Sequence, residues 1–297
     1  MQCEACGDPI GCPNCSVTLT WHRQRRSLEC HYCDYTTAPP ARCPGCREDR
    51  LLVQGLGTEQ LEAVVQELLP RARLVRLDRD TTRRKGAQEA MLKGWAAGRY
   101  DVMIGTQMVT KGHDVPGVTL VGVVLADQSL NFPDFRAAEQ TFQLLAQVAG
   151  RAGRGAEAGR VIVQTLQPHH YSLRSAAAHD FAAFAREELE ARKELDYPPH
   201  ARLLLLRFEG ENLDAVRALA EDAARALRAP RAALRVLGPA PAPLERLRQR
   251  HRWHVLLRGK DGTALRRAAR ALLEQTAERA RKQAIRVVAD VDPYNML

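Results

Sequence analysis

The sequence is poor in several residue types that define common protein classes. Aromatic residues make up 5% of its 297 positions, lysine occurs six times, and cysteine is absent after position 46. No apolar run approaches the roughly 18 residues that a membrane-spanning helix needs, and no charged-then-apolar signal pattern precedes the first cysteine. We therefore expect a cytoplasmic protein. The hydrophobic content of 45% predicts a globular chain, with length enough for two or three domains.

A phosphate-binding loop is also missing. No segment follows the pattern Gly-x-x-x-x-Gly-Lys-[Ser/Thr], and no Asp-Glu pair follows an apolar strand. The residues that would cradle the β- and γ-phosphates of a nucleotide and hold Mg²⁺ are thus absent from these 297 positions. We predict that the chain alone does not hydrolyse ATP efficiently.

Positive charge is concentrated in the last third of the chain. Residues 1–197 carry 24 basic and 24 acidic side chains, whereas residues 198–297 carry 20 basic and 11 acidic ones. A locally basic domain favours a polyanionic partner, with nucleic acid first. The alternative is a solvated surface, because an excess of arginine over lysine with abundant alanine is also typical of GC-rich genomes.

All eight cysteines lie between positions 3 and 46, in four Cys-x-x-Cys pairs. Each pair places two thiolates on one side of a tight turn, as neighbouring corners of a zinc tetrahedron require, and thiolates are soft ligands that suit zinc. A disulfide framework would need a secreted context, and an iron–sulfur cluster is the second alternative. We predict two Zn²⁺ ions.

Four pairs can share two ions in three ways. Between Cys15 and Cys30, two apolar arms flank a polar centre, which predicts a β-hairpin that brings the second pair to the third. The outer pairs then share the other ion, and His22 and His31 are not needed as ligands. The predicted ligands are Cys3, Cys6, Cys43 and Cys46 for one zinc, and Cys12, Cys15, Cys30 and Cys33 for the other.

Between residues 51 and 167, short apolar runs alternate with segments of helical periodicity, which predicts a parallel sheet covered by helices. Two segments in this region point to chemistry. In DVMIGTQMVTKGHDVP (101–116), an apolar strand ends in Gly-Thr before a turn, at the sheet edge where ligands bind. In QVAGRAGR (147–154), two arginines three positions apart at a helix end suit a phosphate-binding fork.

The last hundred residues predict strands and helices in the order β-α-β-β-α-β, a ferredoxin-like split βαβ unit, after a Tyr-Pro-Pro-His linker at 197–200. Two middle strands flank a Pro-rich loop. Arginines alternate at positions 246, 248, 250 and 252 before Trp253, which offers phosphates a basic strip with an aromatic end. The predicted DNA-binding residues are Arg250, Arg252 and Trp253; the alternative is an exposed basic loop with Trp253 in the core.

Segments 101–116 and 147–154 resemble motifs V and VI of superfamily 2 helicases. The combined pattern resembles the PriA family of bacterial primosomal helicases (primosomal protein N′) over nearly the whole chain. Besides these two segments, the resemblance to this family rests on the four Cys-x-x-Cys pairs, the run PDFRAAEQTFQLLAQVAGRAGRG, Pro198-Pro199, GPAPAP at 238–243 and DVDP at 290–293. In that family, an N-terminal DNA 3′-end-binding domain and a first lobe with the phosphate loop precede these segments.

The resemblance implies roles for motif VI. Arg154 matches the arginine finger that contacts the γ-phosphate across the lobe interface, and Arg151 and Gln147 match adjoining positions. The alternative for the two arginines is a pair of surface side chains at a helix C-terminus.

The resemblance also implies roles for motif V. Gly112 and Asp114 match positions beside the nucleotide ribose. Thr106 matches a position that contacts DNA phosphates, and Lys111 is expected to do the same. The alternative for Asp114 is a turn-forming residue.

The sequence thus predicts a two-zinc module (1–50), a RecA-like second helicase lobe (51–196) and a basic α+β domain (197–297). The resemblance implies part of an ATP-dependent 3′–5′ DNA helicase that restarts replication at stalled or abandoned forks by primosome assembly. It implies ATP and Mg²⁺ only together with the first lobe. Its partners are forked and single-stranded DNA, single-strand-binding protein and other primosome proteins, and we expect a monomer. The alternative is an ATPase-inactive zinc DNA-binding or primosome scaffold protein.

Overall fold

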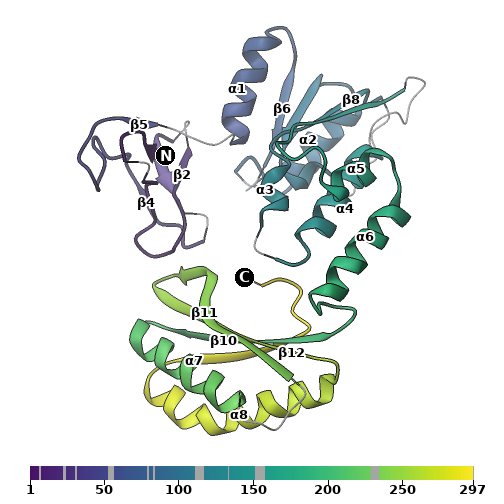
Figure 1. Ribbon diagram of the computed structural model, residues 1–297. Helices are drawn as coiled ribbons and strands as arrows, with labels where there is room; N and C mark the ends of the chain where they lie inside the picture. Colours follow the sequence, from purple (N-terminus) through teal and green to yellow (C-terminus); the bar gives the residue numbers. More distant parts are fainter. Residues whose placement is uncertain are drawn as a thin grey trace. The chain divides into compact units, whose positions relative to one another are not determined.

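The computed structural model describes residues 1–6, 8–22, 25–30, 32–52, 57–78, 80–82, 84–110, 117–132, 134–150, 158–228 and 234–296. The chain divides into two compact units: one is Gly55–Glu188, and the other joins Met1–Gln54 to Leu189–Leu297 (Figure 1). The second unit therefore holds both the cysteine-rich segment and the C-terminal segment. Among the helices in these ranges, none is long and apolar enough to cross a membrane.

The unit Gly55–Glu188 combines helices with parallel strands, as the alternating periodicity predicts. Strand β6 (Leu74–Leu77) pairs in parallel with β7 (Val102–Gly105), and β8 (Leu120–Val123) pairs in parallel with β9 (Arg160–Val163). A parallel pair needs a crossover connection, and α2 (Ala87–Ala96) and α4 (Ala137–Ala149) lie in these connections. The other helices are α1 (Thr58–Leu68), α3 (Asp127–Leu130), α5 (Tyr171–Ala177) and α6 (Phe181–Glu194), with the 3₁₀ helix η1 (Gln107–Thr110) after β7.

One face of α4 anchors that helix in the unit. Phe142, Leu145 and Val148 recur every three residues and are all buried, because this spacing places side chains on one side of a helix. The ring of Phe142 stacks on Phe184 of α6 with centroids 4.2 Å apart. The opposite face of α4 is left to solvent, and it carries Gln147.

Strand β7 ends at a glycine that the packing requires. A Cβ atom on Gly105 would lie 2.3 Å from the carbonyl oxygen of Leu77 and 2.4 Å from Cγ2 of Val109. No side chain tolerates such distances, so only glycine lets β7 stay paired with β6 while the chain turns into η1. Thr106 is thereby placed at the carboxyl end of the strand.

The C-terminal segment has the predicted β-α-β-β-α-β order. Its antiparallel sheet runs β11-β12-β10-β13, which is the arrangement of a ferredoxin-like split βαβ fold. The two helices pack together and against the sheet (Figure 1). The elements are β10 (Arg202–Gly210), α7 (Leu213–Leu227), β11 (Leu234–Leu247), β12 (Arg250–Gly259), α8 (Gly262–Lys282) and β13 (Arg286–Val291).

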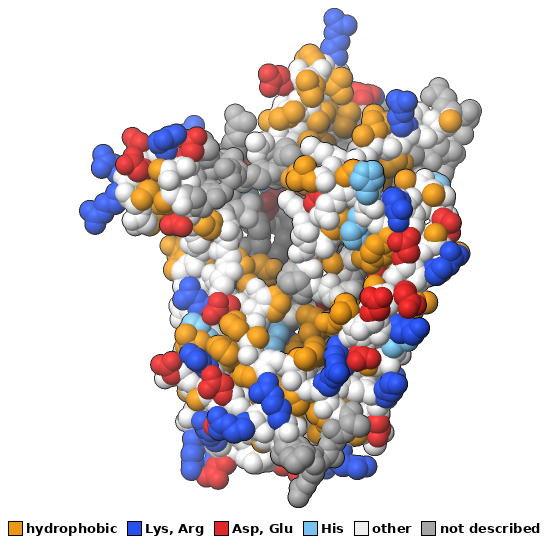
Figure 2. Space-filling model, viewed as in Figure 1, with side chains coloured by type: hydrophobic (Ala, Val, Ile, Leu, Met, Phe, Trp, Pro, Cys, Tyr) orange, Lys and Arg blue, Asp and Glu red, His pale blue; other side chains and the backbone are white. Residues whose placement is uncertain are grey.

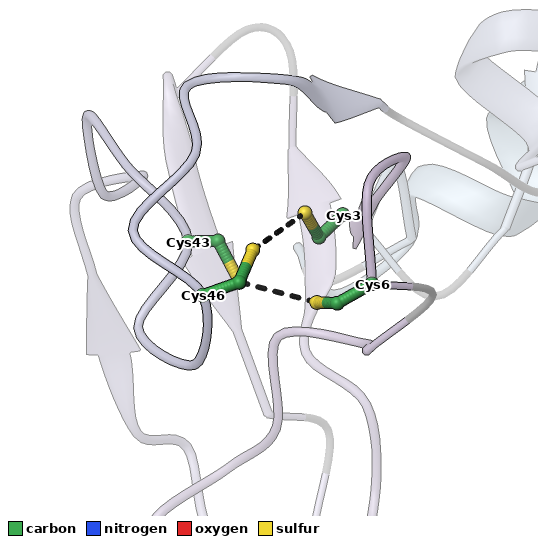
Figure 3. A group of neighbouring side chains, drawn as sticks. All are labelled: Cys3, Cys6, Cys43 and Cys46. Carbon is green, nitrogen blue, oxygen red and sulfur yellow. Dashed lines mark hydrogen bonds between the residues drawn. The ribbon is translucent and has the colours of Figure 1, made fainter.

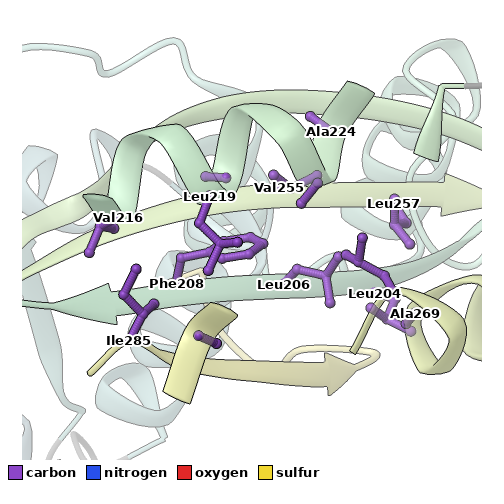
Figure 4. Packing of buried hydrophobic residues seen from close by; sticks show 14 of the residues in the cluster. Leu204, Leu206, Phe208, Val216, Leu219, Ala224, Val255, Leu257, Ala269 and Ile285 are labelled. Carbon is purple, nitrogen blue, oxygen red and sulfur yellow. The ribbon is translucent and has the colours of Figure 1, made fainter. Parts of the chain in front are cut away.

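Alternating residues of β10 and β12 form the core under these helices. Leu206 and Phe208 on β10 and Val255 on β12 have no exposed surface, and they meet Leu219 of α7 (Figure 4). Both helices begin at side-chain caps: Asn212 Oδ1 accepts from the N–H of Ala215, and Asp261 caps α8.

The prediction of a Pro-rich loop between the two middle strands is wrong, because residues 238–243 lie within β11. This strand is at the edge of the sheet, where a proline can face outward without interrupting the ladder. The pairing with β12 is irregular on either side of Ala240 and Pro241, but it resumes at Arg246 and ends with Leu247 opposite Arg250. Strands β11 and β12 are therefore arms of one long hairpin.

Candidate metal centres and nucleic-acid interface

Each Cys-x-x-Cys pair lies on a turn of the same design. In all four turns, the N–H of the first cysteine donates to the carbonyl five positions later, over 2.7–2.9 Å. In the last two turns, Asp34 and Arg47 have φ angles of 59° and 67°, and their N–H groups donate back to the carbonyls of Cys30 and Cys43. The turns therefore hold both sulfurs of a pair on one side.

The outer two pairs converge in one group, whose four side chains point toward one another (Figure 3). The Sγ atom of Cys3 lies 3.5 Å from that of Cys46, and the Sγ atom of Cys6 lies 3.7 Å from that of Cys43. Strands β1 (Gln2–Cys3) and β5 (Leu51–Leu52) pair in an antiparallel manner, which brings the two ends of the cysteine-rich segment together.

The inner two pairs converge across the predicted hairpin. Strands β2 (Thr20–His22) and β3 (Ser27–Glu29) are antiparallel, and β4 (Thr36–Thr37) continues the sheet. The Sγ atom of Cys12 lies 3.6 Å from that of Cys33, and Cys15 and Cys30 complete the group. His22 is buried beside Glu29 rather than in this group, and His31 lies outside the described residues.

Both groups fit zinc. In each, the four sulfur atoms lie within 4.8 Å of one another. A tetrahedral ion with Zn–S bonds of about 2.3 Å separates its sulfurs by about 3.8 Å, close to the distances above. The thiols differ in acidity: hydrogen bonding from the N–H of Cys46 lowers the pKa of Cys43 to about 7, while burial raises the pKa of Cys15 to about 12. A divalent cation offsets the repulsion between four closely spaced thiolates.

The structure also reveals contacts of the inner group that sequence reasoning missed. The backbone N–H of Arg248 donates to Sγ of Cys15 over 3.2 Å, and Gln249 hydrogen bonds to Asn14. The sequence carries no clear signal for this turn, because Arg248-Gln249 is not among the residue pairs that two-residue hairpin turns favour. Nothing in the sequence indicates what such a turn contacts.

Of the predicted positions in motifs V and VI, the structure describes Thr106 and Gln147. Thr106 is exposed directly after β7, and Gln147 is exposed near the end of α4. Helix α4 contacts η1, so the two motif-bearing segments are neighbours in this unit. The remaining predicted residues lie outside the described ranges, and their roles stay predictions: Lys111, Gly112, Asp114, Arg151 and Arg154.

The predicted basic strip is divided by the hairpin turn. Arg250 and Arg252 follow the turn on β12, and alternation places both on the face opposite Trp253. Arg250 pairs with Glu209 at 3.2 Å, Arg252 is only 5% exposed, and Trp253 packs against the core. On the face in Figure 2, Lys and Arg side chains are interspersed with Asp and Glu. DNA contact by these three residues remains a prediction.

A buried histidine beside this strip predicts acid sensitivity. Burial, followed by the charges of Arg252 and Arg207, lowers the pKa of His254 to about 4. In the unfolded chain its pKa is about 6.5, so below that pH the unfolded state takes up a proton that the folded state does not. The C-terminal domain is expected to lose about 2 kcal/mol of stability between pH 7 and pH 5 from this residue.

The variant His254→Leu should lack that loss. Amide exchange in β10 and β12 is measured in both proteins. As the pH falls from 7 to 5, we expect the exchange rate of the native chain to rise relative to that of the variant. A ratio that stays constant would show that His254 is not the titrating group.

The fold and these centres define a class: a helicase C-terminal domain that carries a cysteine-rich zinc-binding module. Three family models match the chain in this order: "PriA DNA helicase Cys-rich region (CRR) domain" over residues 12–37, "Helicase conserved C-terminal domain" over residues 47–156, and "Primosomal protein N C-terminal domain" over residues 193–294. The chain belongs to the PriA family of replication restart proteins and matches the C-terminal portion of its members.

Individual relatives are similar over the full length of the chain. The replication restart protein PriA of Bacillus subtilis is 39% identical over 298 residues, covering 100% of this chain and 37% of the relative. Those of Treponema pallidum and Haemophilus influenzae are 39% and 37% identical, again covering 100% of this chain, and 45% and 40% of the relatives. The chain therefore spans less than half the length of these curated relatives.

Proposed function

We propose that this chain is the C-terminal portion of an ATP-dependent 3′–5′ DNA helicase. The complete protein would recognise stalled or abandoned replication forks and restart replication by primosome assembly. One observation carries the proposal: the cysteine-rich, helicase and C-terminal matches follow one another over nearly the whole chain, in relatives named as replication restart proteins.

In this proposal, ATP and Mg²⁺ bind at an interface completed by a lobe that carries the phosphate-binding loop. Arg154 stabilises negative charge on the γ-phosphate, with Arg151 and Gln147 beside it. Gly112 and Asp114 lie beside the ribose. The exposed position of Gln147 and its proximity to the motif V segment support this assignment.

DNA is the proposed macromolecular substrate, contacted by Thr106 and Lys111 in the lobe and by the basic C-terminal domain. The two zinc ions serve as structural ions, because four cysteines fill each site and leave no open position for a reacting molecule. We further propose a monomer in the cytoplasm, where a reducing environment keeps thiols available for metal. Single-strand-binding protein and other primosome proteins are its proposed partners.

A second candidate function is favoured by the two four-cysteine groups, which suit structural metal ions rather than a reaction. Without a motor lobe, these residues would hold forked DNA and partner proteins as a zinc-stabilised scaffold. The two functions differ in one property, since only the first requires the chain to complete a working ATPase.

A chimaeric protein tests this difference. The chain replaces the portion of the Bacillus subtilis relative that it matches, with that relative truncated before this portion as the control. We expect the chimaera to unwind a forked duplex in an ATP-dependent manner and the truncated protein to be inactive. A chimaera that folds and binds forked DNA but hydrolyses no ATP would overturn the helicase assignment and favour the scaffold.

A further inference from the structure

The tip of the β11–β12 hairpin, residues 246–250, lies against the turn that carries Cys12 and Cys15. The N–H of Ser16 donates to the carbonyl of Arg246 over 2.8 Å, and the N–H of Gln249 donates to the carbonyl of Asn14 over 2.7 Å. These backbone bonds join residues more than two hundred positions apart. They dock the hairpin tip on the first turn of the inner zinc site.

The hydrogen bonds of the hairpin tip continue to the sulfur atoms. The N–H of Arg248 donates directly to Sγ of Cys15 over 3.2 Å. Asn14 forms a second, indirect connection between the hairpin tip and the site. Its side-chain oxygen accepts a hydrogen bond from the side chain of Gln249 over 3.1 Å, and its backbone N–H donates to Sγ of Cys12 over 3.4 Å. Groups that hydrogen bond to a metal's ligands fix their orientation and tune metal affinity.

The conformation of the turn supports a specific role. Arg248 and Gln249 have φ angles of 50° and 66°, and they form the two-residue turn between the paired residues Leu247 and Arg250. Turns with two positive φ angles strongly favour Asn-Gly, because arginine and glutamine are strained there. The hairpin alone therefore does not explain these two residues, whereas their contacts do.

Their side chains provide those contacts. Arg248 Nε donates to the carbonyl of Tyr32 over 3.0 Å, so one residue touches both halves of the inner site. Leu247 packs against the buried cluster that contains Cys15 and Leu28. In the described part of the chain, no residue of the C-terminal domain donates a hydrogen bond to a sulfur of the outer site.

We propose that the hairpin tip is the outer coordination shell of the inner zinc site, so that zinc binding there fixes the C-terminal domain to the cysteine-rich module. Zinc affinity and hairpin docking are then thermodynamically linked, and loss of either weakens the other. The outer zinc lacks this linkage. This inference goes beyond the proposed helicase function and holds or fails independently of it.

The first test removes the side-chain contacts but keeps the turn. Arg248→Asn combined with Gln249→Gly introduces the residue pair that such a turn prefers, and Arg267→Asn on the exposed face of α8 is the control. Zinc release from the loaded chain to a chromogenic chelator is followed over time. We expect one of the two ions to leave about 10-fold faster in the double variant, with the other ion and the control unchanged. Equal release from the native chain and the double variant would overturn the role of these two side chains in the outer coordination shell.

The second test runs in the opposite direction. Cys33→Ser removes an inner ligand but keeps Cys15 as an acceptor, and Cys46→Ser removes a ligand of the outer site. Amide exchange is measured at residues 246–250, with α7 as an internal reference for a folded C-terminal domain. We expect exchange at the hairpin tip to rise about 10-fold in Cys33→Ser only. An equal rise in both variants, or no rise in either, would overturn the proposal.

Discussion

Replacing Arg154 with alanine in the chimaeric helicase is expected to lower the turnover number for DNA-stimulated ATP hydrolysis by about 10³-fold. An arginine finger stabilises charge that develops on the transferred phosphoryl group, and a water-excluding interface strengthens that stabilisation. Arg151 lies three positions before Arg154 in the QVAGRAGR string and matches the adjoining motif position. The Kd for forked DNA should stay nearly unchanged, so the loss separates catalysis from binding.

Two further variants sharpen this prediction. Arg154→Lys keeps a positive charge but loses the planar fork, and it should remain at least about 10²-fold impaired because lysine does not donate two parallel hydrogen bonds. Arg99→Ala, at an exposed turn after α2, is the matched control and should retain full activity. A loss below 10-fold in Arg154→Ala, with Arg151→Ala more severe, would move the finger to Arg151.

Much of the fold could be predicted because the signals are local. An apolar run in β10 and helical periodicity in α7 identify both elements, and the structure places the helix cap at Asn212. The order of elements then leaves few topologies, which is why the ferredoxin-like arrangement was predictable. The cysteine groups follow similarly, since each turn spans four residues and one hairpin connects the inner pairs.

The exceptions depend on long-range packing. Proline is a strand breaker in a central position but not at an edge, and the sequence alone does not reveal that β11 is an edge strand. Alternation shows that Arg252 and Trp253 face opposite sides of β12, but not that Arg252 is the more buried of the two. Docking of Arg248 on Cys15 joins positions that no local pattern relates.

The zinc ligands give the second large expected effect. Cys30→Ser should reduce the zinc content from two ions to one per chain and unfold the three-stranded sheet of the cysteine-rich module. Its strands span only two or three residues, and strands this short do not form a stable sheet without another source of stability. Structural zinc in small modules supplies on the order of 10 kcal/mol, far more than Leu19 and Leu28 gain by burial.

Elemental analysis and limited proteolysis check this expectation. Cys46→Ser is the matched control, because it also removes one ligand and one ion but should leave β2 and β3 resistant to protease. The core around Phe208 should stay folded in both variants, since the metal groups contribute no residue to that cluster. Two ions retained by Cys30→Ser would mean that the inner site does not need its fourth thiolate. Loss of both ions would mean that the two sites fold as one, because β1 and β5 and the inner hairpin would then depend on each other.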